Sequence, residues 1–377
     1  MSVISTIGKI GASILKYIGM LISCLVGILF ITSAYSGLCS PEQSAEIALL
    51  GLGFPILLLI TILSLIIWAA CGKWKMVILE IIFLLICFYP IHAFSPFNLT
   101  SKRVSENDST IKVLTYNVMN FDTHNYDPET GNDKALKYIL EQDADIVMLQ
   151  EGSSNVKMDK IKPLKELLPE LNEKYPYRDK SKRDLIILSK RPYKIVNERI
   201  TENAPNKSVA YRIKMDGFEL YVINVHLESL KFNDKDRDFY RGITDITKSP
   251  QNLNETTLRD FKNTLLNKTA QAFRLRSAQA EDIRKYINTL GDANVILCGD
   301  FNDTPFSYAQ RTIMGTDMTD VYKECAFGPT ITFHANRFYF RIDHMLYKGR
   351  NLEAVDIERG DIKYSDHYPL VATFKIH

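Results

Sequence analysis

Polar side chains recur where apolar, strand-like runs end, and their types could serve one reaction. The run at 294–297 leads into Cys298-Gly-Asp-Phe-Asn-Asp-Thr-Pro305, which places Asp300, Asn302 and Asp303 within four residues. A buried strand that ends in such a cluster is typical of a site that faces a cation or a phosphate. The stretch from Asp303 is also ordinary turn chemistry, so the cluster needs partners elsewhere in the chain before a site is inferred.

Five more segments supply such partners at the ends of apolar runs. They are Thr115-Tyr-Asn117-Val-Met-Asn120, Leu149-Gln-Glu151, Asn224-Val-His226-Leu-Glu228, Arg341-Ile-Asp343-His344 and Ser365-Asp366-His367. Taken singly, a Glu after a strand is most often a solvated turn residue, and a His there is most often structural. Six such signals in one domain, all of types that fit one chemistry, favour an active site.

Hydrolysis of a phosphate ester needs these residue types. Mg²⁺ neutralises the phosphate and prefers a few carboxylates plus water, which Glu151 and Asp366 can supply. Asp300 can orient or deprotonate the attacking water, and Asp343 can hold a histidine in one tautomer. Negative charge accumulates on the non-bridging oxygens of the phosphate, where hydrogen-bond donors are needed. The candidate donors are Asn302, His226 and His367.

In this order the motifs closely resemble the endonuclease/exonuclease/phosphatase superfamily of metal-dependent phosphohydrolases. The strongest are Leu149-Gln-Glu151, Gly299-Asp-Phe-Asn302 with Pro305, and Ser365-Asp-His367, and the resemblance covers about Ile111 to Ile376. It implies a four-layered α/β sandwich, in which helices flank two packed mixed sheets and the site lies at one end. It also implies Mg²⁺ as the cofactor, for which Mn²⁺ could substitute.

The resemblance implies a role for each polar residue. The metal-binding residues would be Asn117, Glu151 and Asp366. The catalytic residues would be His226, Asp300, Asn302, Asp343 and His367. Asp300 would act on the water, Asn302 on the phosphate, and Asp343 on His367, which would stabilise the transition state or act as acid/base. His226 matches a position that is Tyr in the abasic-site enzymes of the family. A His at this position therefore argues against a role in base-excision repair.

One segment departs from the family pattern. The family usually has a Gly at the head of the strand that corresponds to Arg183-Asp-Leu-Ile-Ile-Leu-Ser189. The difference affects the local backbone and removes no catalytic group that the resemblance assigns.

The elements that would position these residues follow an α/β pattern after residue 110. The strand candidates are Ile111–Tyr116, Ala144–Leu149, Leu185–Leu188, Val209–Met215, Leu220–Val225, Val295–Cys298, Arg341–Tyr347 and Pro369–Phe374. The helix candidates are Lys134–Gln142, Met158–Leu168 and Gln271–Leu290. Asp216-Gly217 between two alternating runs predicts a hairpin, so we expect antiparallel pairs within layered sheets rather than a doubly wound parallel sheet. The polar region Leu230–Lys268 predicts a surface insertion that could border the site.

The first hundred residues differ in composition from the rest. Of 46 basic and 44 acidic residues only four and three lie there, and residues 17–41, 47–72 and 81–101 carry no charge. Each of these runs can supply the roughly 20 apolar residues of a transmembrane helix. We therefore predict that the chain has three parts: a membrane region at 1–100, a linker at 101–110 and a catalytic domain at 111–377. The membrane region would contain three transmembrane helices and contact the lipid bilayer through residues 10–97.

The basic residues of the membrane region predict its orientation. Lys9 and Lys16 lie near the N-terminus, Lys73 and Lys75 lie in the second loop, and the first loop has no Lys or Arg. The positive-inside rule places the N-terminus and second loop in the cytoplasm. An integral, multi-pass protein with three spans then has an extracytoplasmic catalytic domain. The Lys-Arg pair at 102–103 argues against this orientation.

Charge also bears on the substrate. The region after residue 100 is nearly neutral, which gives no support to non-specific binding of nucleic acid. The prediction is a membrane-anchored, Mg²⁺-dependent phosphohydrolase that cleaves a phosphodiester or phosphomonoester, such as a lipid or inositol-type head group. An anchored nuclease acting on DNA or RNA is the alternative. A catalytically silent binding protein is a third reading, although such proteins normally lose a metal ligand or the terminal His.

Overall fold

The computed structural model describes residues 3–99, 102, 104–105, 107–121, 134–152, 162–179, 184–198, 208–230, 255–335 and 339–377. The chain forms two compact units. The first comprises Met1–Ala93 with Phe306–Tyr308, and the second comprises Phe94–Pro305 with Ala309–His377.

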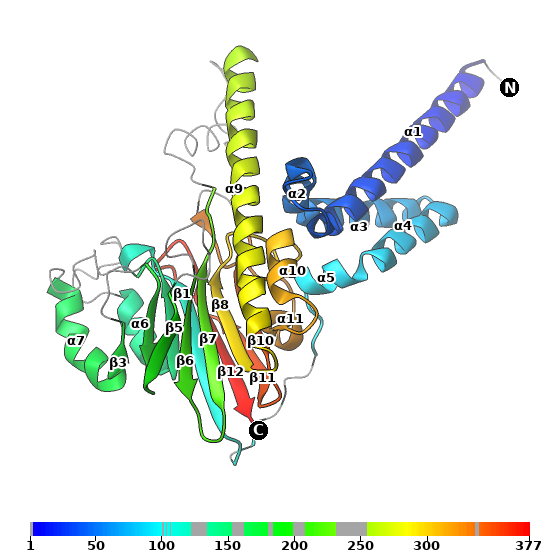
Figure 1. Ribbon diagram of the computed structural model, residues 1–377. Helices are drawn as coiled ribbons and strands as arrows, with labels where there is room; N and C mark the ends of the chain where they lie inside the picture. The colour runs from blue at the N-terminus through cyan, green and yellow to red at the C-terminus, as the bar shows by residue number, and fades with distance from the viewer. Residues whose placement is uncertain are drawn as a thin grey trace. The chain divides into compact units, whose positions relative to one another are not determined.

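The second unit contains two six-stranded mixed sheets (Figure 1). The first sheet has the order β11-β12-β1-β2-β4-β3. Its strands are β1 Thr110–Asn117, β2 Ile146–Gln150, β3 Tyr177–Arg178, β4 Ile186–Ser189, β11 Leu352–Arg359 and β12 Leu370–Ile376. The second sheet has the order β5-β6-β7-β8-β10-β9. Its strands are β5 Tyr193–Asn197, β6 Ser208–Lys214, β7 Glu219–His226, β8 Asn294–Asp300, β9 Thr319–Asp320 and β10 Asp343–Lys348.

Each sheet contains one parallel pair of strands, and these pairs decide where the polar residues gather. β1 runs parallel to β2, and β7 runs parallel to β8. Their neighbours β12, β4 and β10 run antiparallel to them. Antiparallel strands therefore begin at the edge where the parallel strands end. Residues that follow a parallel strand and residues that precede its antiparallel neighbour consequently meet at one edge of each sheet.

Three apolar clusters fill the spaces between four layers. Alternation along each strand sends Val113 and Val222 between the two sheets and sends their neighbours Leu114 and Ile223 to the outer faces. Helices α6 Lys134–Gln142 and α7 Lys162–Lys174 cover the outer face of the first sheet. Helices α9 Glu255–Thr289 and α10 Tyr308–Met314 cover the outer face of the second. The two mixed sheets with flanking helices are as expected from the sequence.

Most predicted elements are present. Every predicted strand is found, and the Asp216-Gly217 hairpin joins β6 to β7, where the Met215 amide donates to the Phe218 carbonyl over 2.9 Å. Gly217 has a φ of 94°, which a residue with a Cβ rarely adopts. The strands not predicted are β3, β5, β9 and β11. All four lie at sheet edges, where a strand has a neighbour on one side only.

The helices differ more from the expectation. α6 has the predicted bounds, and α7 extends beyond the predicted Met158–Leu168, whose first residues lie outside the described part of the chain. α9 begins at Glu255 rather than Gln271. The second part of the predicted insertion Leu230–Lys268 is therefore helical, and residues 231–254 lie outside the described residues. The remaining short elements are α11 Val321–Cys325 and the 3₁₀ turns Ser36–Leu38 and Met119–Phe121.

The first unit is helical, and one of its helices is long and apolar enough to cross a membrane. The helix is α1, Val3–Ala34, and the stretch that meets the criterion is Ser13–Ala34. Two further stretches meet the criterion only as bent pairs. They are α2 Ala45–Leu52 with α3 Phe54–Ala70, bent by 60°, and α4 Trp74–Ile86 with α5 Phe88–Phe94, bent by 64°. The predicted three spans therefore reduce to one unbroken helix and two broken candidates.

A polar network joins three helices of this unit. The Trp68 indole nitrogen of α3 donates to the Ser23 hydroxyl of α1 over 2.8 Å, and the hydroxyls of Ser23 and Ser64 lie 3.0 Å apart. The Ser64 hydroxyl then donates to Oε1 of Glu80 in α4 over 2.6 Å. Hydrogen bonds of this kind hold apolar helices together where hydrophobic burial alone gives no preference.

Candidate active site

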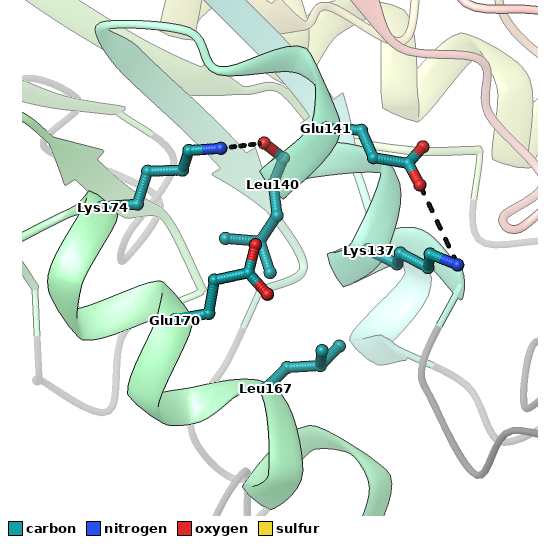
Figure 2. Close-up of a pocket in the computed structure, with 6 residues that line it drawn as sticks. All are labelled: Lys137, Leu140, Glu141, Leu167, Glu170 and Lys174. Atoms are coloured by element: carbon teal, nitrogen blue, oxygen red, sulfur yellow. Dashed lines mark hydrogen bonds and ion pairs between the residues drawn. The ribbon is translucent and has the colours of Figure 1, made fainter.

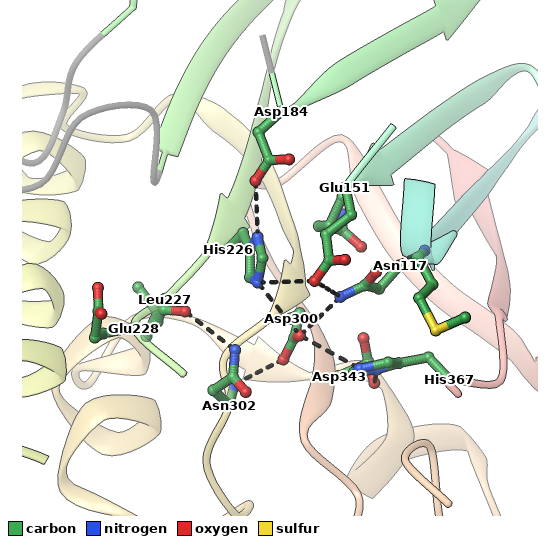
Figure 3. Close-up of polar contacts among 12 residues, drawn as sticks. Asn117, Glu151, Asp184, His226, Leu227, Glu228, Asp300, Asn302, Asp343 and His367 are labelled. Carbon is green, nitrogen blue, oxygen red and sulfur yellow. Dashed lines mark hydrogen bonds and ion pairs between the residues drawn. The ribbon is translucent and has the colours of Figure 1, made fainter. Parts of the chain in front are cut away.

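Asp300 lies at the centre of the strand-end cluster, where it is 1% exposed (Figure 3). It is the last residue of β8, and the strand register places His226 of β7 on one side of it and Asp343 of β10 on the other. Its Oδ1 accepts from the Asn302 amide over 2.8 Å, and its Oδ2 accepts from the Asn117 side chain over 3.1 Å. The carboxylate is thus held from both sheets.

His226 is oriented by a carboxylate from the opposite sheet. Its Nδ1 lies 3.1 Å from Oδ2 of Asp184, which is two residues before the start of β4 (Figure 3). Its Nε2 lies 3.7 Å from Oδ2 of Asp300 and 3.8 Å from Oε1 of Glu151. A carboxylate on one ring nitrogen leaves the other nitrogen directed into the centre of the site.

His367 has the same arrangement with the sheets exchanged. Its Nδ1 lies 2.8 Å from Oδ2 of Asp343 on the second sheet, and its Nε2 lies 3.6 Å from Oδ2 of Asp300. Burial lowers the pKa of His367, but the carboxylates of Asp343 and Asp300 raise it more strongly, so that it reaches about 10. The ring of Phe333 packs 5.0 Å from the imidazole, centroid to centroid. This histidine is therefore positively charged at neutral pH.

Glu151 and Asn117 occupy the side of the site next to β1 and β2. The Asn117 amide nitrogen donates to Glu151 Oε1 over 3.2 Å, and its Oδ1 accepts from the Met119 amide over 3.1 Å. Burial raises the pKa of Glu151, and the nearby carboxylates of Asp300 and Asp366 raise it further. Clustered carboxylates with a raised pKa gain from a cation between them.

These residues fit a divalent cation, because carboxylate and amide oxygens are the ligands that Mg²⁺ prefers. The ligand atoms of Asp300, Asp343 and His367 lie within 4.8 Å of one another and form a second candidate group. In that group the Asp343 carboxylate already binds the imidazole over 2.8 Å. A bonded His–Asp pair of this kind suits proton handling.

The turn after β8 has a backbone that holds Asn302 in place. Asn302 has a φ of 52°, and its side-chain amide donates to the Leu227 carbonyl over 3.1 Å. Glu151 also has a φ of 52°, so two predicted site residues adopt the left-handed conformation that non-glycine residues rarely adopt. At Gly299 a Cβ would lie 1.9 Å from the Val225 carbonyl oxygen, so only glycine allows β8 to approach β7 there.

A buried arginine braces the same turn from α9. The guanidinium of Arg276, 1% exposed, donates to the carbonyls of Asn302 and Glu228. Its Nε lies 3.4 Å from the Asp303 carboxylate. The loop before β12 is tied down similarly, because the Ser365 hydroxyl donates to the Asn117 carbonyl over 2.7 Å.

The sequence of the domain that carries this site matches the model of a known protein family. The model of the endonuclease/exonuclease/phosphatase family matches residues 114–367, more than half of the chain and all of the strand-end cluster. This chain belongs to the endonuclease/exonuclease/phosphatase family. A second family model, a domain of unknown function (DUF8431), matches residues 15–94. Among curated proteins, none matches this chain.

Solved structures are similar at low identity. The human Nocturnin catalytic domain with bound sulfate is 17% identical, and the match covers 71% of this chain and 94% of that domain with a TM-score of 0.47. The D. rerio TDP2 humanized by 14 mutations is 18% identical, with coverages of 70% and 98% and a TM-score of 0.46. A family member from Bacteroides vulgatus is 17% identical, with coverages of 71% and 100% and a TM-score of 0.44. Similarity at this level does not bear on the substrate.

In this endonuclease/exonuclease/phosphatase domain, the structure brings every predicted site residue to one edge. These residues are Asn117, Glu151, His226, Asp300, Asn302, Asp343, Asp366 and His367. The sequence interpretation missed Asp184 and Arg276. Asp184 had the same signal as the others, an acidic residue beside an apolar strand, but its segment was noticed only for lacking a glycine. Arg276 falls on the buried face of α9 with Ala280 and Ile283, where an arginine is unusual.

A hollow elsewhere on the family domain is not part of this site. It lies between α6 and α7, has a volume of about 400 Å³, and is lined by Lys137, Leu140, Glu141, Leu167, Glu170 and Lys174 (Figure 2). None of the strand-end residues lines it. Lys137 pairs with Glu141 at 4.0 Å, and the Lys174 ammonium donates to the Leu140 carbonyl over 2.7 Å. Three of its four charged side chains are thus engaged with the helices that form it.

Proposed function

We propose that this protein is a membrane-anchored, Mg²⁺-dependent phosphohydrolase that cleaves a phosphodiester or phosphomonoester. Members of this family are phosphoesterases or nucleases, which supports the proposal, and the reaction of this chain is our inference. The observation that carries it is the position of Asp300 between the Nε2 atoms of His226 and His367, at 3.7 and 3.6 Å. Each histidine is held by an aspartate on the opposite sheet.

Asp300 suits the role of general base for the attacking water. The amide of Asn302 and the side chain of Asn117 hold its two oxygens, which keeps the carboxylate in one orientation. The water oxygen would bond to phosphorus while Asp300 takes the proton and the phosphorus–oxygen ester bond breaks.

His367 suits stabilisation of the phosphate, because it is positively charged at neutral pH. Its Nε2 can donate to a phosphate oxygen or to the leaving oxygen, while Asp343 keeps Nδ1 protonated. His226 and Asn302 would donate to the other non-bridging oxygens. Asp184 would act through His226 as a positioning residue.

Asn117, Glu151 and Asp366 would hold the Mg²⁺, with Mn²⁺ as a substitute. The bound cation neutralises charge on the phosphate during attack. Asn117 directs its nitrogen at the carboxylates, so it would have to rotate its amide to offer oxygen to a cation. Of the three proposed metal ligands, Asn117 is therefore the one whose role most needs a test.

The helical unit would anchor the domain through three spans, two of them bent. With that anchor, the positive-inside rule would put the catalytic domain outside the cytoplasm. Fusions to the C-terminus test this: an extracytoplasmic domain gives active alkaline phosphatase and dark green fluorescent protein, and the reverse pattern would reject it.

The substrate we favour is a membrane-associated phosphate ester, such as a lipid or inositol-type head group. The soluble region is nearly neutral, whereas an enzyme that binds DNA without sequence preference gains affinity from Lys and Arg. Anchoring also keeps the site near lipid. Nucleic acid remains the competing substrate.

The deciding experiment compares two substrates at matched Mg²⁺ and near-physiological salt. The full chain in mixed-lipid vesicles is assayed for release of phosphate or phosphorylated head group, and in parallel for nicking of plasmid DNA. We expect lipid turnover that a chelator abolishes. Efficient nicking with untouched lipids would replace the lipid substrate by DNA, and turnover in chelator would reject the metal. Folded protein that fails to hydrolyse a generic chromogenic phosphodiester would indicate a silent binding protein.

A further inference from the structure

The chain that follows α5 is bound to the second unit. Phe97 forms an antiparallel bridge with Phe327, and the Gly328 amide donates to the Pro96 carbonyl over 2.7 Å. All four residues belong to the second unit. The chain therefore adds a short strand-like segment to this unit as soon as the last apolar helix ends.

Two further contacts hold the segment. The Asn98 side-chain amide donates to the carbonyls of Lys323 and Ala326 over 2.9 and 2.8 Å, which satisfies carbonyls at the C-terminal end of α11. Lys102 pairs with Glu324 of α11 and, at 3.1 Å, with Glu353 of β11. Lys102, which lies in the linker predicted at 101–110, is thus held against the second unit.

Three large apolar side chains in and beside this segment are more than half exposed. Phe97 is 51% exposed, Leu99 is 85% exposed and Phe327 is 64% exposed. We name these three residues the apolar ledge. Phe97 and Phe327 face each other across a β-bridge, so their Cα atoms lie about 4.5–5.5 Å apart and the two rings form one patch.

Chain continuity limits where this ledge can be. Phe97 is three residues beyond Phe94, the end of α5. Three extended residues span at most about 10 Å. The head-group layer on each side of the hydrocarbon core is about 5–8 Å thick. With the bent pair α4–α5 as the third proposed span, Phe97 would lie within or at the outer edge of the head-group layer on the side where that span ends, with Phe327 beside it.

We propose that the apolar ledge inserts into the head-group region of the bilayer that holds the helical unit, and so docks the catalytic domain on the membrane surface. The proposal rests on the membrane anchoring proposed above. Aromatic side chains are favoured at this depth because their rings suit a region between hydrocarbon and water. Exposed apolar groups that would cost free energy in water are then covered by lipid.

The ledge is also connected to the active site by a short piece of chain. Phe333, whose ring contacts His367, is six residues beyond Phe327 in the chain, so at most about 20 Å of extended chain lies between them. Near its end, the Thr332 hydroxyl accepts from the backbone amide of Asp343 over 3.0 Å. Docking by the ledge thus holds the catalytic histidine close to the membrane surface, where phosphate head groups lie.

Depth-dependent quenching of tryptophan fluorescence tests the ledge. The chain has two tryptophans, Trp68 and Trp74, both in the helical unit, so Phe327→Trp adds one reporter over a wild-type background that can be subtracted. Tyr177→Trp is the matched control, because Tyr177 is an exposed aromatic residue on β3, at the opposite edge of the first sheet from β11. In vesicles with lipids brominated near the glycerol backbone, we expect about twofold stronger quenching at 327 than at 177.

The outcomes separate the ledge from the anchoring. Equal quenching at both positions, in a chain that resists alkaline extraction, overturns the ledge and leaves the anchor. A chain that alkali strips from the vesicles overturns both. An unquenched reporter at 327 whose emission shifts to the blue as protein concentration rises assigns the patch to a second copy and overturns the lipid proposal.

Catalysis supplies a second readout. The double variant Phe97→Ser/Phe327→Ser should lose about 10-fold activity on a lipid substrate in vesicles and keep wild-type activity on a soluble chromogenic phosphodiester. Loss on both substrates would mean damage to the fold and would overturn a docking role for the ledge, as would no loss on either.

Discussion

The two histidine–aspartate pairs of the active site have the same design but differ in burial. Each pair joins the two sheets, and each histidine directs its Nε2 at Asp300. The side chains of Asp343 and His367 are 3% and 5% exposed, whereas that of Asp184 is 34% exposed against 7% for its partner His226. A carboxylate in a dry site acts more strongly on its partner than one that water screens. We infer that Asp343 stabilises the positive charge of His367, whereas Asp184 mainly orients the imidazole of His226.

The largest expected effect comes from the residue that both pairs share. Asp300→Asn should lower kcat by about 10⁴-fold, because it removes the base for water and the carboxylate that faces both imidazoles. Steady-state hydrolysis of a chromogenic phosphodiester measures this, with circular dichroism to verify the fold. Asp216→Asn, on the exposed hairpin turn, is the control that should behave as wild type. Near wild-type kcat in Asp300→Asn would remove this residue from the centre of the mechanism.

Glu151→Gln tests the side of the site next to His226. The variant should lose about 10³-fold activity and need more Mg²⁺ for half-maximal rate, because a neutral amide is a poor ligand for a hard dication. A titration of rate against Mg²⁺ concentration separates lost binding from lost chemistry. An unchanged Mg²⁺ requirement would place the cation elsewhere.

Replacing the buried aspartate should cost more than replacing the exposed one. Asp343→Asn should reduce kcat by about 10²–10³-fold, since His367 would lose both its charge partner and its fixed tautomer. The loss should appear in kcat more than in KM. Retention of more than half the wild-type kcat would show that Asp343 does not control His367.

Asp184→Asn should have a smaller effect, of about 10-fold, because an amide can still accept from His226 and the position is partly solvated. The ratio of the loss in kcat for Asp343→Asn to that for Asp184→Asn measures how much the two pairs differ. Equal losses in Asp184→Asn and Asp343→Asn would mean that burial does not distinguish the pairs.

The smallest expected change is in stability against pH. The pKa of His367 is about 10 in the folded metal-free protein and about 6.5 when unfolded, so its contribution to stability is complete below about pH 6.5 and is lost as pH rises through about 10. The difference in free energy of unfolding between wild type and His367→Gln should therefore shrink from pH 7 toward pH 10. Denaturant unfolding at several pH values measures it, and a difference that stays constant over that range would contradict the raised pKa.

Much of this site could be predicted, because its residues share a local signal. An apolar run followed or preceded by Asp, Asn, Glu or His marks the end of a buried strand, and His226, Asp300 and Asp343 were found in this way. Asp184 carries the same signal, an acidic residue beside the apolar run Leu185–Leu188, but was not among the predicted site residues. Arg276 was missed because its partners, the carbonyls of Asn302 and Glu228, are distant in sequence.

The helical region shows the limit of composition as a guide. Three uncharged runs predicted three helices of spanning length, and each is helical in the structure. The bends near Gly53 and Cys87 depend on backbone hydrogen bonds at helix ends, which composition does not report. The docking of Asn98 on α11 was likewise not predicted, because Asn98 falls in the uncharged run 81–101 that was assigned to the membrane region.

The sequence by itself determined the residue types of the site, the strands that carry them and the separation of an apolar helical region from an α/β domain. These follow from short-range patterns, because alternation of period two and uncharged runs are properties of neighbouring residues. Only the tertiary structure decided the partners: His226 pairs with Asp184 across 42 residues and His367 with Asp343 across 24, each from one sheet to the other. The physical reason is that such a hydrogen bond depends on how two sheets pack face to face, and no local periodicity encodes the distance between them.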